Sequence, residues 1–150
     1  MAGMLPVILC GKTTKIAVGV ISALKPEMDV VHLCLTPEAG KIEIPAILKQ
    51  EPVTTDVELG SKNYETIPKA IIVGGGYNDE DLDVLRRSCQ TAKTPLVPWL
   101  RPDLNKPTPP LGPEVLFKYG KALVERIKLL IKQMEKENKL NGSTDEVFWF

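Results

Sequence analysis

The sequence predicts an α/β protein with a small, doubly wound, mostly parallel sheet of about four strands. Short apolar runs of strand length alternate along the chain with amphipathic runs of helix length. Turn and capping residues separate these runs, as expected where strands and helices follow one another. The length of 150 residues suits one domain and is too short for two ordinary ones.

The first part of the chain has the pattern strand, helix, strand. Pro6–Cys10 (PVILC) is wholly apolar, which is typical of a strand buried on both faces. Thr13 or Thr14 can cap the following helix, KIAVGVISAL, which should stop before Pro26 because the residue before a proline disfavours helical backbone. Asp29–Leu35 (DVVHLCL) follows as the second strand.

The region after the second strand is harder to assign. Residues 36–40 are typical of a turn, and Pro45 argues against a single helix from 37 to 49. We therefore expect only a short helix near residues 45–49, with Pro45 in its first turn. Residues 50–69 are polar and without clear periodicity, which indicates either an irregular or disordered insertion or a mobile lid.

Two further strands follow. Ala70–Val73 (AIIV) is the third, and it leads into a glycine-rich turn. Asn78 should cap the next helix, with Asp81 at the position of a capping box. Leu96–Leu100 (LVPWL) is the fourth strand, in which Pro98 suggests an edge position or a bulge.

The last third of the chain combines a strap, a helix and a tail. Residues 101–113 hold five of the thirteen prolines and should be extended. A long amphipathic helix follows, with apolar residues at steps of three and four. The tail 141–150 ends in EVFWF, which is too apolar to stay free and should dock on its own domain or on a partner. Together these elements predict one domain over 1–150, with strand order 2-1-3-4 and a long C-terminal helix.

Composition excludes several classes of function. Lys plus Arg and Asp plus Glu number 19 each, so no net charge attracts nucleic acid or an anionic membrane. Cys10, Cys34 and Cys89 lack CxxC spacing, and with one histidine there is no zinc pattern, so we predict buried free thiols and no metal. His32 fits a packed core histidine or, alternatively, a catalytic base. Without a signal peptide or membrane span, the expected location is cytoplasmic.

The predicted strand order indicates where a ligand-binding crevice should lie. In open α/β sheets, ligands bind at the carboxyl ends of the strands where the order reverses, here between strands 1 and 3. Residues 11–13 should therefore face residues 74–76. The basic start of the first helix favours an anion, whereas the acidic start of the third would repel one. The predicted ligand-binding residues are Gly11, Lys12, Thr13, Thr36, Gly74, Gly75, Gly76, Tyr77 and Trp99.

Two nucleotide-binding motifs fail on inspection. A P-loop needs a glycine five positions before Gly11, where Pro6 stands. The dinucleotide fingerprint would need glycines where Thr13 and Ile16 stand, and the acid expected after strand 2 is absent near Thr36. The cofactor therefore stays unknown, and NAD(P) is possible although its fingerprint is not met.

Two residues are candidates for catalysis. Arg101 follows the fourth strand beside Trp99, with Tyr77 expected across the crevice, and this set suits an anionic ligand with a ring. Alternatively, Arg101 forms a structural pair with Asp103 or Glu38. Glu38 is the carboxylate on the loop after strand 2 and is therefore the candidate acid or base.

Several segments carry a resemblance to other proteins. They are PVILCGKT, VVHLCLTPEAG, IIVGGGY, PWLRPDLNKPTPPLGP and YGKALVERIK, and together they cover nearly the whole chain apart from 50–69. In these segments the chain resembles a group of small fungal proteins described as hypothetical or Rossmann-like. The resemblance implies a Rossmann-like fold and a fungal origin, with a suggested link to natural-product pathways. The resemblance implies no particular activity and assigns no catalytic residue.

Three functions remain open at this point. The first is a small-molecule binding protein or an enzyme of fungal secondary metabolism, of isomerase, cyclase or lyase type, that uses the crevice. The second is an NAD(P)-dependent oxidoreductase. The third is a non-catalytic interaction or dimerisation module that uses the proline strap, the long helix and the tail. The expected partners are a small-molecule ligand and, in a homodimer, a second copy of the chain.

Overall fold

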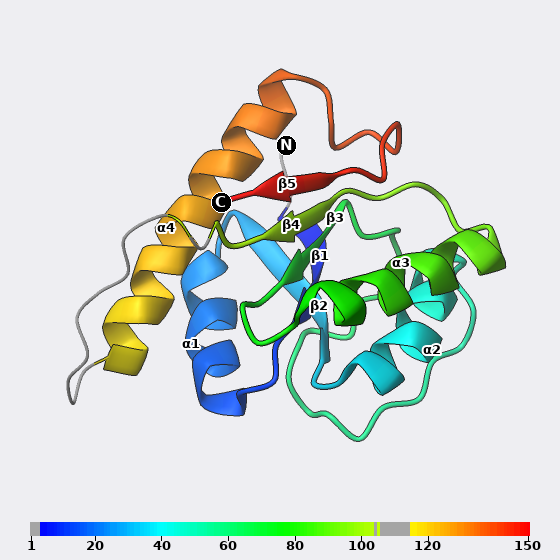
Figure 1. The fold of residues 1–150 in the computed structure, drawn as a ribbon, viewed down its shortest axis with the longest axis horizontal. Coiled ribbons are helices and arrows are strands. Elements are labelled where there is room, and N and C mark those ends of the chain that lie inside the picture. Colours follow the sequence, from blue (N-terminus) through cyan, green and yellow to red (C-terminus); the bar gives the residue numbers. More distant parts are fainter. Residues whose placement is uncertain (1–3, 104, 106–114) are drawn as a thin grey trace.

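A computed structural model describes residues 4–103, 105 and 115–150 of the protein, and for residues 115–120 it describes the backbone alone. Within these residues there are five strands and four helices (Figure 1). In chain order they are β1 (Leu5–Cys10), α1 (Thr14–Leu24), β2 (Met28–Cys34), α2 (Pro37–Leu48), β3 (Ala70–Val73), α3 (Asp79–Ala92), β4 (Trp99–Arg101), α4 (Val115–Lys136) and β5 (Val147–Trp149).

The strands form one sheet with the order β2-β1-β3-β4-β5, and all four pairs are parallel. The predicted α/β class and parallel sheet are confirmed, but the four-strand prediction lacked β5. Because β5 pairs with β4, β4 is not the edge strand that Pro98 suggested. The strand begins just after Pro98, whose carbonyl oxygen accepts a hydrogen bond from the Ile71 N–H at 3.0 Å. A proline lacks only the donor, so it can still accept within the sheet.

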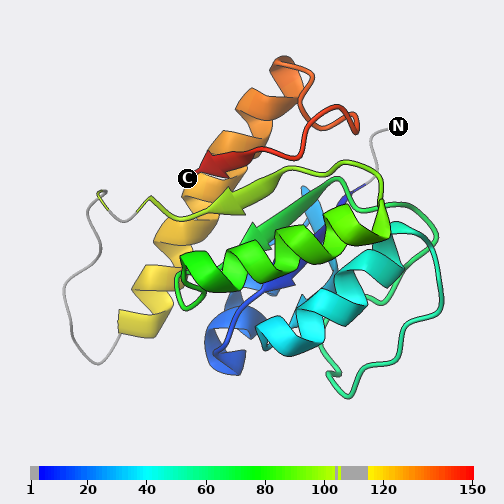
Figure 2. The same ribbon diagram turned by 45° about the vertical axis from the view of Figure 1, so that its right-hand side comes forward.

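Helices cover both faces of the sheet. Figures 1 and 2 show α1 and α4 on one side and α2 and α3 on the other. The core is accordingly divided by the sheet into two clusters. Leu9 and Ile72 pack toward α1 and α4, whereas Ile8, Ile71 and Val73 pack toward α2 and α3. Strands covered on both faces explain the wholly apolar runs in the sequence.

Helix α2 differs from the prediction, because residues 37–48 form one helix that contains Pro45. The Thr36 hydroxyl oxygen accepts a hydrogen bond from the Ala39 N–H at 3.1 Å and so caps the start. A proline inside a helix removes one backbone hydrogen bond and crowds the preceding turn. Burial of Ile44, Ile47 and Leu48 against the sheet offsets that cost.

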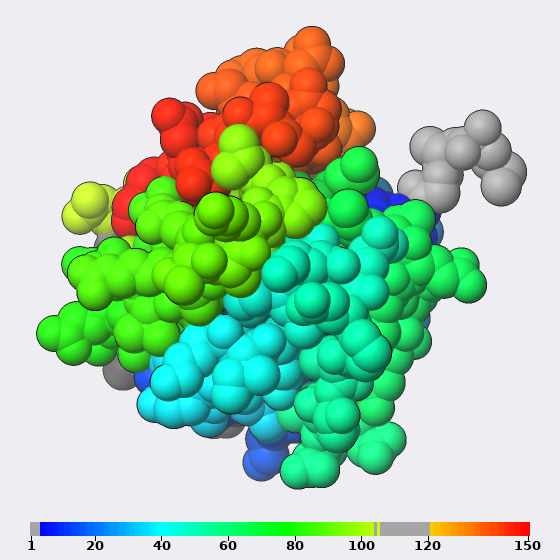
Figure 3. Space-filling model, turned by 90° about the vertical axis from the view of Figure 1, so that its right-hand side faces the viewer, coloured from blue at the N-terminus to red at the C-terminus, as the bar shows by residue number. Residues whose placement is uncertain are grey.

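The segment 50–69 is irregular, as predicted, but it is held along the outer edge of β2. The N–H groups of Ser61 and Lys62 donate to the carbonyl oxygens of Val30 and Val31 at 2.9 and 2.8 Å. Figure 3 shows this segment beside α2 on the molecular surface. It thereby covers backbone groups of a sheet edge that would otherwise be free to pair with another chain.

The C-terminal tail docks on its own domain, which decides between the two predicted alternatives. Beyond β5, the Phe150 N–H donates to the Arg101 carbonyl oxygen at 2.9 Å, and the Asp103 N–H donates to the Phe150 carbonyl oxygen at 2.7 Å. Most of the proline strap predicted at 101–113 lies outside the described residues. In the part of the chain that is described, no helix has the length and apolar character needed to cross a membrane.

Candidate functional site

The two glycine-containing loops meet at the carboxyl ends of β1 and β3, as the strand order predicted. β1 and β3 are neighbours, with Cys10 opposite Val73. The Gly74 N–H donates to the Cys10 carbonyl oxygen at 2.8 Å. A side chain at Gly74 would bring its Cβ to 3.1 Å from that same oxygen, so the close approach of the loops favours glycine.

A cavity of about 120 Å³ lies between these loops and the helices on one face of the sheet. Its polar end is formed by both loops, Gly11–Thr13 and Gly74–Gly76. Its described walls are otherwise apolar and come from β1, α1, β3, α4 and the tail: Leu9, Ile16, Ala17, Val20, Ile72, Leu123, Ile127 and Phe150. The cavity therefore combines an apolar body with a polar opening, and it lies between β1 and β3, where the strand order of the sheet reverses.

The charge at the mouth of the cavity is partly compensated. The Lys12 ammonium lies 3.2 Å from the Asp81 carboxylate and 5.3 Å from the centre of the Tyr77 ring. Asp81 also accepts from the Asn78 N–H at 2.9 Å in the predicted capping box. The Asn78 hydrogen bond, together with Lys12, lowers the pKa of Asp81. Thr13 is the N-cap residue of α1, but its side chain makes no capping hydrogen bond.

Tyr77 is buried behind the glycine turn. Its hydroxyl donates to the Cys34 carbonyl oxygen at 2.9 Å, and burial raises its pKa well above the usual value. A neutral phenol held in this way serves as a structural link between the loop after β3 and the end of β2.

Arg101 lies in a broader groove beside the cavity. Its guanidinium is 2.7 Å from the Asp79 carboxylate, donates to the Tyr77 carbonyl oxygen at 3.1 Å, and lies 5.3 Å from the centre of the Trp149 ring. Asp79 is thus its partner, instead of the predicted Asp103 or Glu38. The groove of about 620 Å³ also includes Gly75.

Trp99 does not fit the predicted role of a ring beside Arg101. It is fully buried and packs in the core on the α2 and α3 face. The exposed ring next to Arg101 is Trp149, which comes from the strand that the sequence did not predict. Thr36 caps α2, and Glu38 is exposed in the first turn of that helix. Neither residue is among the described residues that line the cavity.

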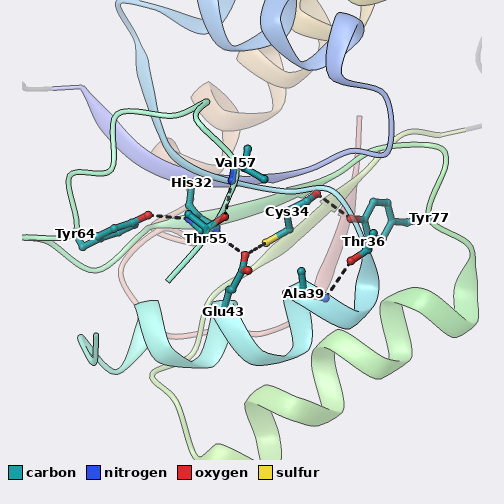
Figure 4. Close-up of polar contacts among 9 residues, drawn as sticks. All are labelled: His32, Cys34, Thr36, Ala39, Glu43, Thr55, Val57, Tyr64 and Tyr77. Atoms are coloured by element: carbon teal, nitrogen blue, oxygen red, sulfur yellow. Dashed lines mark hydrogen bonds and ion pairs between the residues drawn. The ribbon is translucent and has the colours of Figure 1, made fainter. Parts of the chain in front are cut away.

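A second polar cluster lies between β2 and α2 (Figure 4). His32 Nε2 lies 2.6 Å from a carboxylate oxygen of Glu43, and the Cys34 thiol donates to the same oxygen at 3.9 Å. The Tyr64 hydroxyl lies 2.8 Å from His32 Nδ1. The imidazole nitrogen, the thiol sulfur and the carboxylate oxygen lie within 4.8 Å of one another, so these side chains are candidates for holding a metal ion.

Burial and close contacts shift the pKa values in this cluster. Burial lowers the pKa of His32, but its contacts with Cys34 and Glu43 outweigh that effect and raise it above 6.5. The neighbouring Cys10 side chain and burial raise the pKa of Cys34 well above its usual value. Sequence reasoning missed this cluster because Glu43 fell between the predicted turn at 36–40 and the predicted short helix at 45–49, and so was assigned to no element. The available signal was the i, i+2 spacing of His32 and Cys34 on one strand.

Comparison with known proteins identifies one fungal relative. The chain is 40% identical over 144 residues to a protein of Aspergillus oryzae named "Kojic acid related protein 6", and the match covers 94% of this chain and 82% of the relative. The chain belongs to the family of that protein. No protein-family model and no solved structure matches the chain. Membership of the Kojic acid related protein 6 family therefore supports the fungal resemblance, whereas a Rossmann-like family is not shown.

Proposed function

We propose that this chain is a small-molecule binding protein of fungal secondary metabolism whose ligand, of about one ring, occupies the cavity between Gly11–Thr13 and Gly74–Gly76. The observation that carries the proposal is the apolar cavity at the carboxyl ends of β1 and β3. That is the position where open α/β sheets bind ligands, and an apolar pocket with a few convergent polar groups is the usual form of such a site.

The size and lining of the cavity indicate the class of ligand. Its volume is about 120 Å³. In another protein, an apolar cavity of about 150 Å³ holds benzene. The apolar walls favour a flat ring, and the Thr13 hydroxyl, which makes no capping hydrogen bond and belongs to the polar end of the cavity, can pair with a carbonyl or hydroxyl substituent. The name of the relative supports this class, because kojic acid is a single oxygen heterocycle with such substituents.

We propose binding and no specific reaction. A step of isomerase, cyclase or lyase type needs an acid or base at the bound ligand. Glu38 and Arg101, the predicted candidates, do not line the cavity, and Arg101 is engaged by Asp79 and Tyr77. Dinucleotide binding is less well supported, because Thr13 and Ile16 line the cavity at the positions where the fingerprint needs glycines.

A pair of variants tests the proposal. Ala17 faces the cavity from α1, whereas the adjacent Val18 points to solvent. Ala17→Met should fill the cavity and weaken binding at least tenfold, and Val18→Met should leave binding unchanged. Isothermal titration with kojic acid and other single-ring hydroxylated heterocycles measures the effect, with circular dichroism confirming that both variants fold.

Native mass spectrometry of the protein expressed in and purified from a filamentous fungus provides a second, independent measurement. We expect a bound small molecule that is retained by Val18→Met and lost by Ala17→Met. Equal occupancy in the two variants would place the ligand elsewhere. Stabilisation by NADP⁺ alone would favour the oxidoreductase alternative, and a ligand-free dimer would favour the interaction module.

A further inference from the structure

We propose that His32, Cys34 and Glu43 form a binding site for a zinc-like divalent metal ion. His32 and Cys34 extend from β2 toward α2, where Glu43 lies (Figure 4). His32 is 1% exposed and the Glu43 side chain 13%, so the cluster is buried with one ligand near the surface. The site lies on the α2 face of the sheet, whereas the proposed ligand cavity lies on the α1 and α4 face.

The donor atoms select the class of metal. Imidazole nitrogen, thiolate sulfur and carboxylate oxygen are the three kinds of ligand that Zn²⁺ binds in proteins. Sulfur disfavours Mg²⁺ and Ca²⁺, which prefer all-oxygen sites. Three protein ligands also leave a fourth tetrahedral position open, as in catalytic zinc sites.

Of the two observed distances between ligand atoms, one is shorter and one is longer than a tetrahedral metal ion requires. Metal–ligand bonds of about 2.0–2.3 Å place neighbouring ligand atoms roughly 3.3–3.6 Å apart. The separation of His32 Nε2 from Glu43 Oε1 is 2.6 Å, and that of Glu43 Oε1 from Cys34 Sγ is 3.9 Å. Metal binding therefore requires the Glu43 carboxylate to move away from His32 Nε2 and toward Cys34 Sγ. The ligand atoms of the two strand residues lie within 4.8 Å of each other.

Tyr64 supplies the support that ligating histidines usually have. Its hydroxyl lies 2.8 Å from His32 Nδ1, on the side of the ring away from Glu43. When that hydroxyl accepts the Nδ1 proton, Nε2 presents its lone pair to the metal, and such outer partners fix the orientation of the ring. Tyr64 belongs to the 50–69 segment along the edge of β2, so this irregular segment closes the site.

Once a metal ion displaces the thiol proton of Cys34, the charge of the three ligands favours a divalent ion over a monovalent one. A neutral imidazole, a thiolate and a carboxylate together carry two negative charges, which a divalent ion neutralises. A buried group of charges is tolerated only when it is compensated in this way. The same balance excludes a monovalent ion as a good fit.

Cobalt substitution tests the site in the full chain. Metal-stripped protein titrated with Co²⁺ should bind one equivalent and develop the charge-transfer absorption of a thiolate–cobalt bond, with Zn²⁺ displacing the Co²⁺ and Mg²⁺ failing to do so. Cys34→Ser should abolish the absorption and weaken binding by at least about a hundredfold, because loss of an outer partner alone already costs roughly ten- to a hundredfold. Cys89→Ser is the matched control, because Cys89 is equally a buried thiol but lies on α3, and it should retain both.

Two milder variants protect the test against misfolding. Glu43→Gln keeps the size of the side chain and should weaken Co²⁺ binding at least tenfold. Tyr64→Phe should weaken binding roughly ten- to a hundredfold while the thiolate absorption remains. Binding of no Co²⁺ by the wild type, or absorption that survives Cys34→Ser, would overturn the assignment. Ala17→Met should leave Co²⁺ binding intact, which separates this site from the ligand cavity.

Discussion

Phe150→Ala should be among the most destabilising single changes in this chain. Phe150 is 2% exposed, packs in the core shared by α1 and α4, and lines the cavity. An aromatic side chain buries about 150–250 Å², which at roughly 25 cal/mol per Å² corresponds to about 4–6 kcal/mol. Alanine retains part of that, so we expect a loss of about 3–5 kcal/mol of unfolding free energy. The backbone hydrogen bonds of residue 150 remain in the variant.

Urea unfolding followed by circular dichroism measures this loss. The matched control is Trp149→Ala, one residue earlier, because the Trp149 side chain is 51% exposed and its described partner is the Arg101 guanidinium at 5.3 Å. An exposed contact of this kind contributes about 0.5–1 kcal/mol. If Phe150→Ala cost no more than Trp149→Ala, the tail would not be part of the core, and the wall of the cavity would be wrongly placed.

Four smaller changes test other features of the fold. Asn78→Ala removes the capping box of α3 and should lower stability by about 1 kcal/mol, measured by thermal melting. Gly19→Ala, on the exposed side of α1 with open space around it, should raise stability by about 0.5–1 kcal/mol in the same measurement. Gly60→Ala should lower the free energy of unfolding, measured in urea, more than Gly142→Ala does. Both glycines have positive φ, but only at position 60 would the new Cβ meet a backbone atom, the Val31 carbonyl oxygen at 3.0 Å. The lowered pKa of Asp81 means that its ionised form stabilises the fold above about pH 3.8 and that this stabilisation is lost as the pH falls through the lowered value. The difference in urea midpoint between wild type and Asp81→Asn should therefore be constant near neutral pH and shrink below pH 3.8.

The sequence predicted correctly those parts of the fold whose residue pattern fits only one kind of secondary structure. Wholly apolar runs such as Pro6–Cys10 and Ala70–Val73 fit a strand covered on both faces, and the box from Asn78 to Asp81 marks a helix start. β5 was missed because three residues carry no periodicity, and only the neighbouring β4 makes them a strand. At Pro45, buried contacts of the whole helix outweighed the local preference of one residue.

The candidate sites were predictable to different degrees for the same reason. The meeting of Gly11–Thr13 with Gly74–Gly76 follows from strand order, which the sequence indicates. The i, i+2 spacing places His32 and Cys34 on one face of β2, but the position of Glu43 depends on how α2 packs across that strand, which no sequence spacing expresses. The prediction placed the ring of Trp99 beside Arg101, where the structure has the ring of Trp149, because the strand that carries Trp149 had not been predicted.

Tyr77 connects the two candidate sites across the sheet. Its hydroxyl donates to the carbonyl oxygen of Cys34, and its ring lies 5.3 Å from the Lys12 ammonium at the mouth of the cavity. The same residue accepts from Arg101 through its backbone. Tyr77 therefore links the turn after β3 to the end of β2 through its hydroxyl, to the loop after β1 through its ring, and to the end of β4 through its backbone carbonyl. The two candidate sites therefore differ in chemistry and lie on opposite faces of the sheet, and the turn that follows β3 lines one of them and contacts the strand that carries the other.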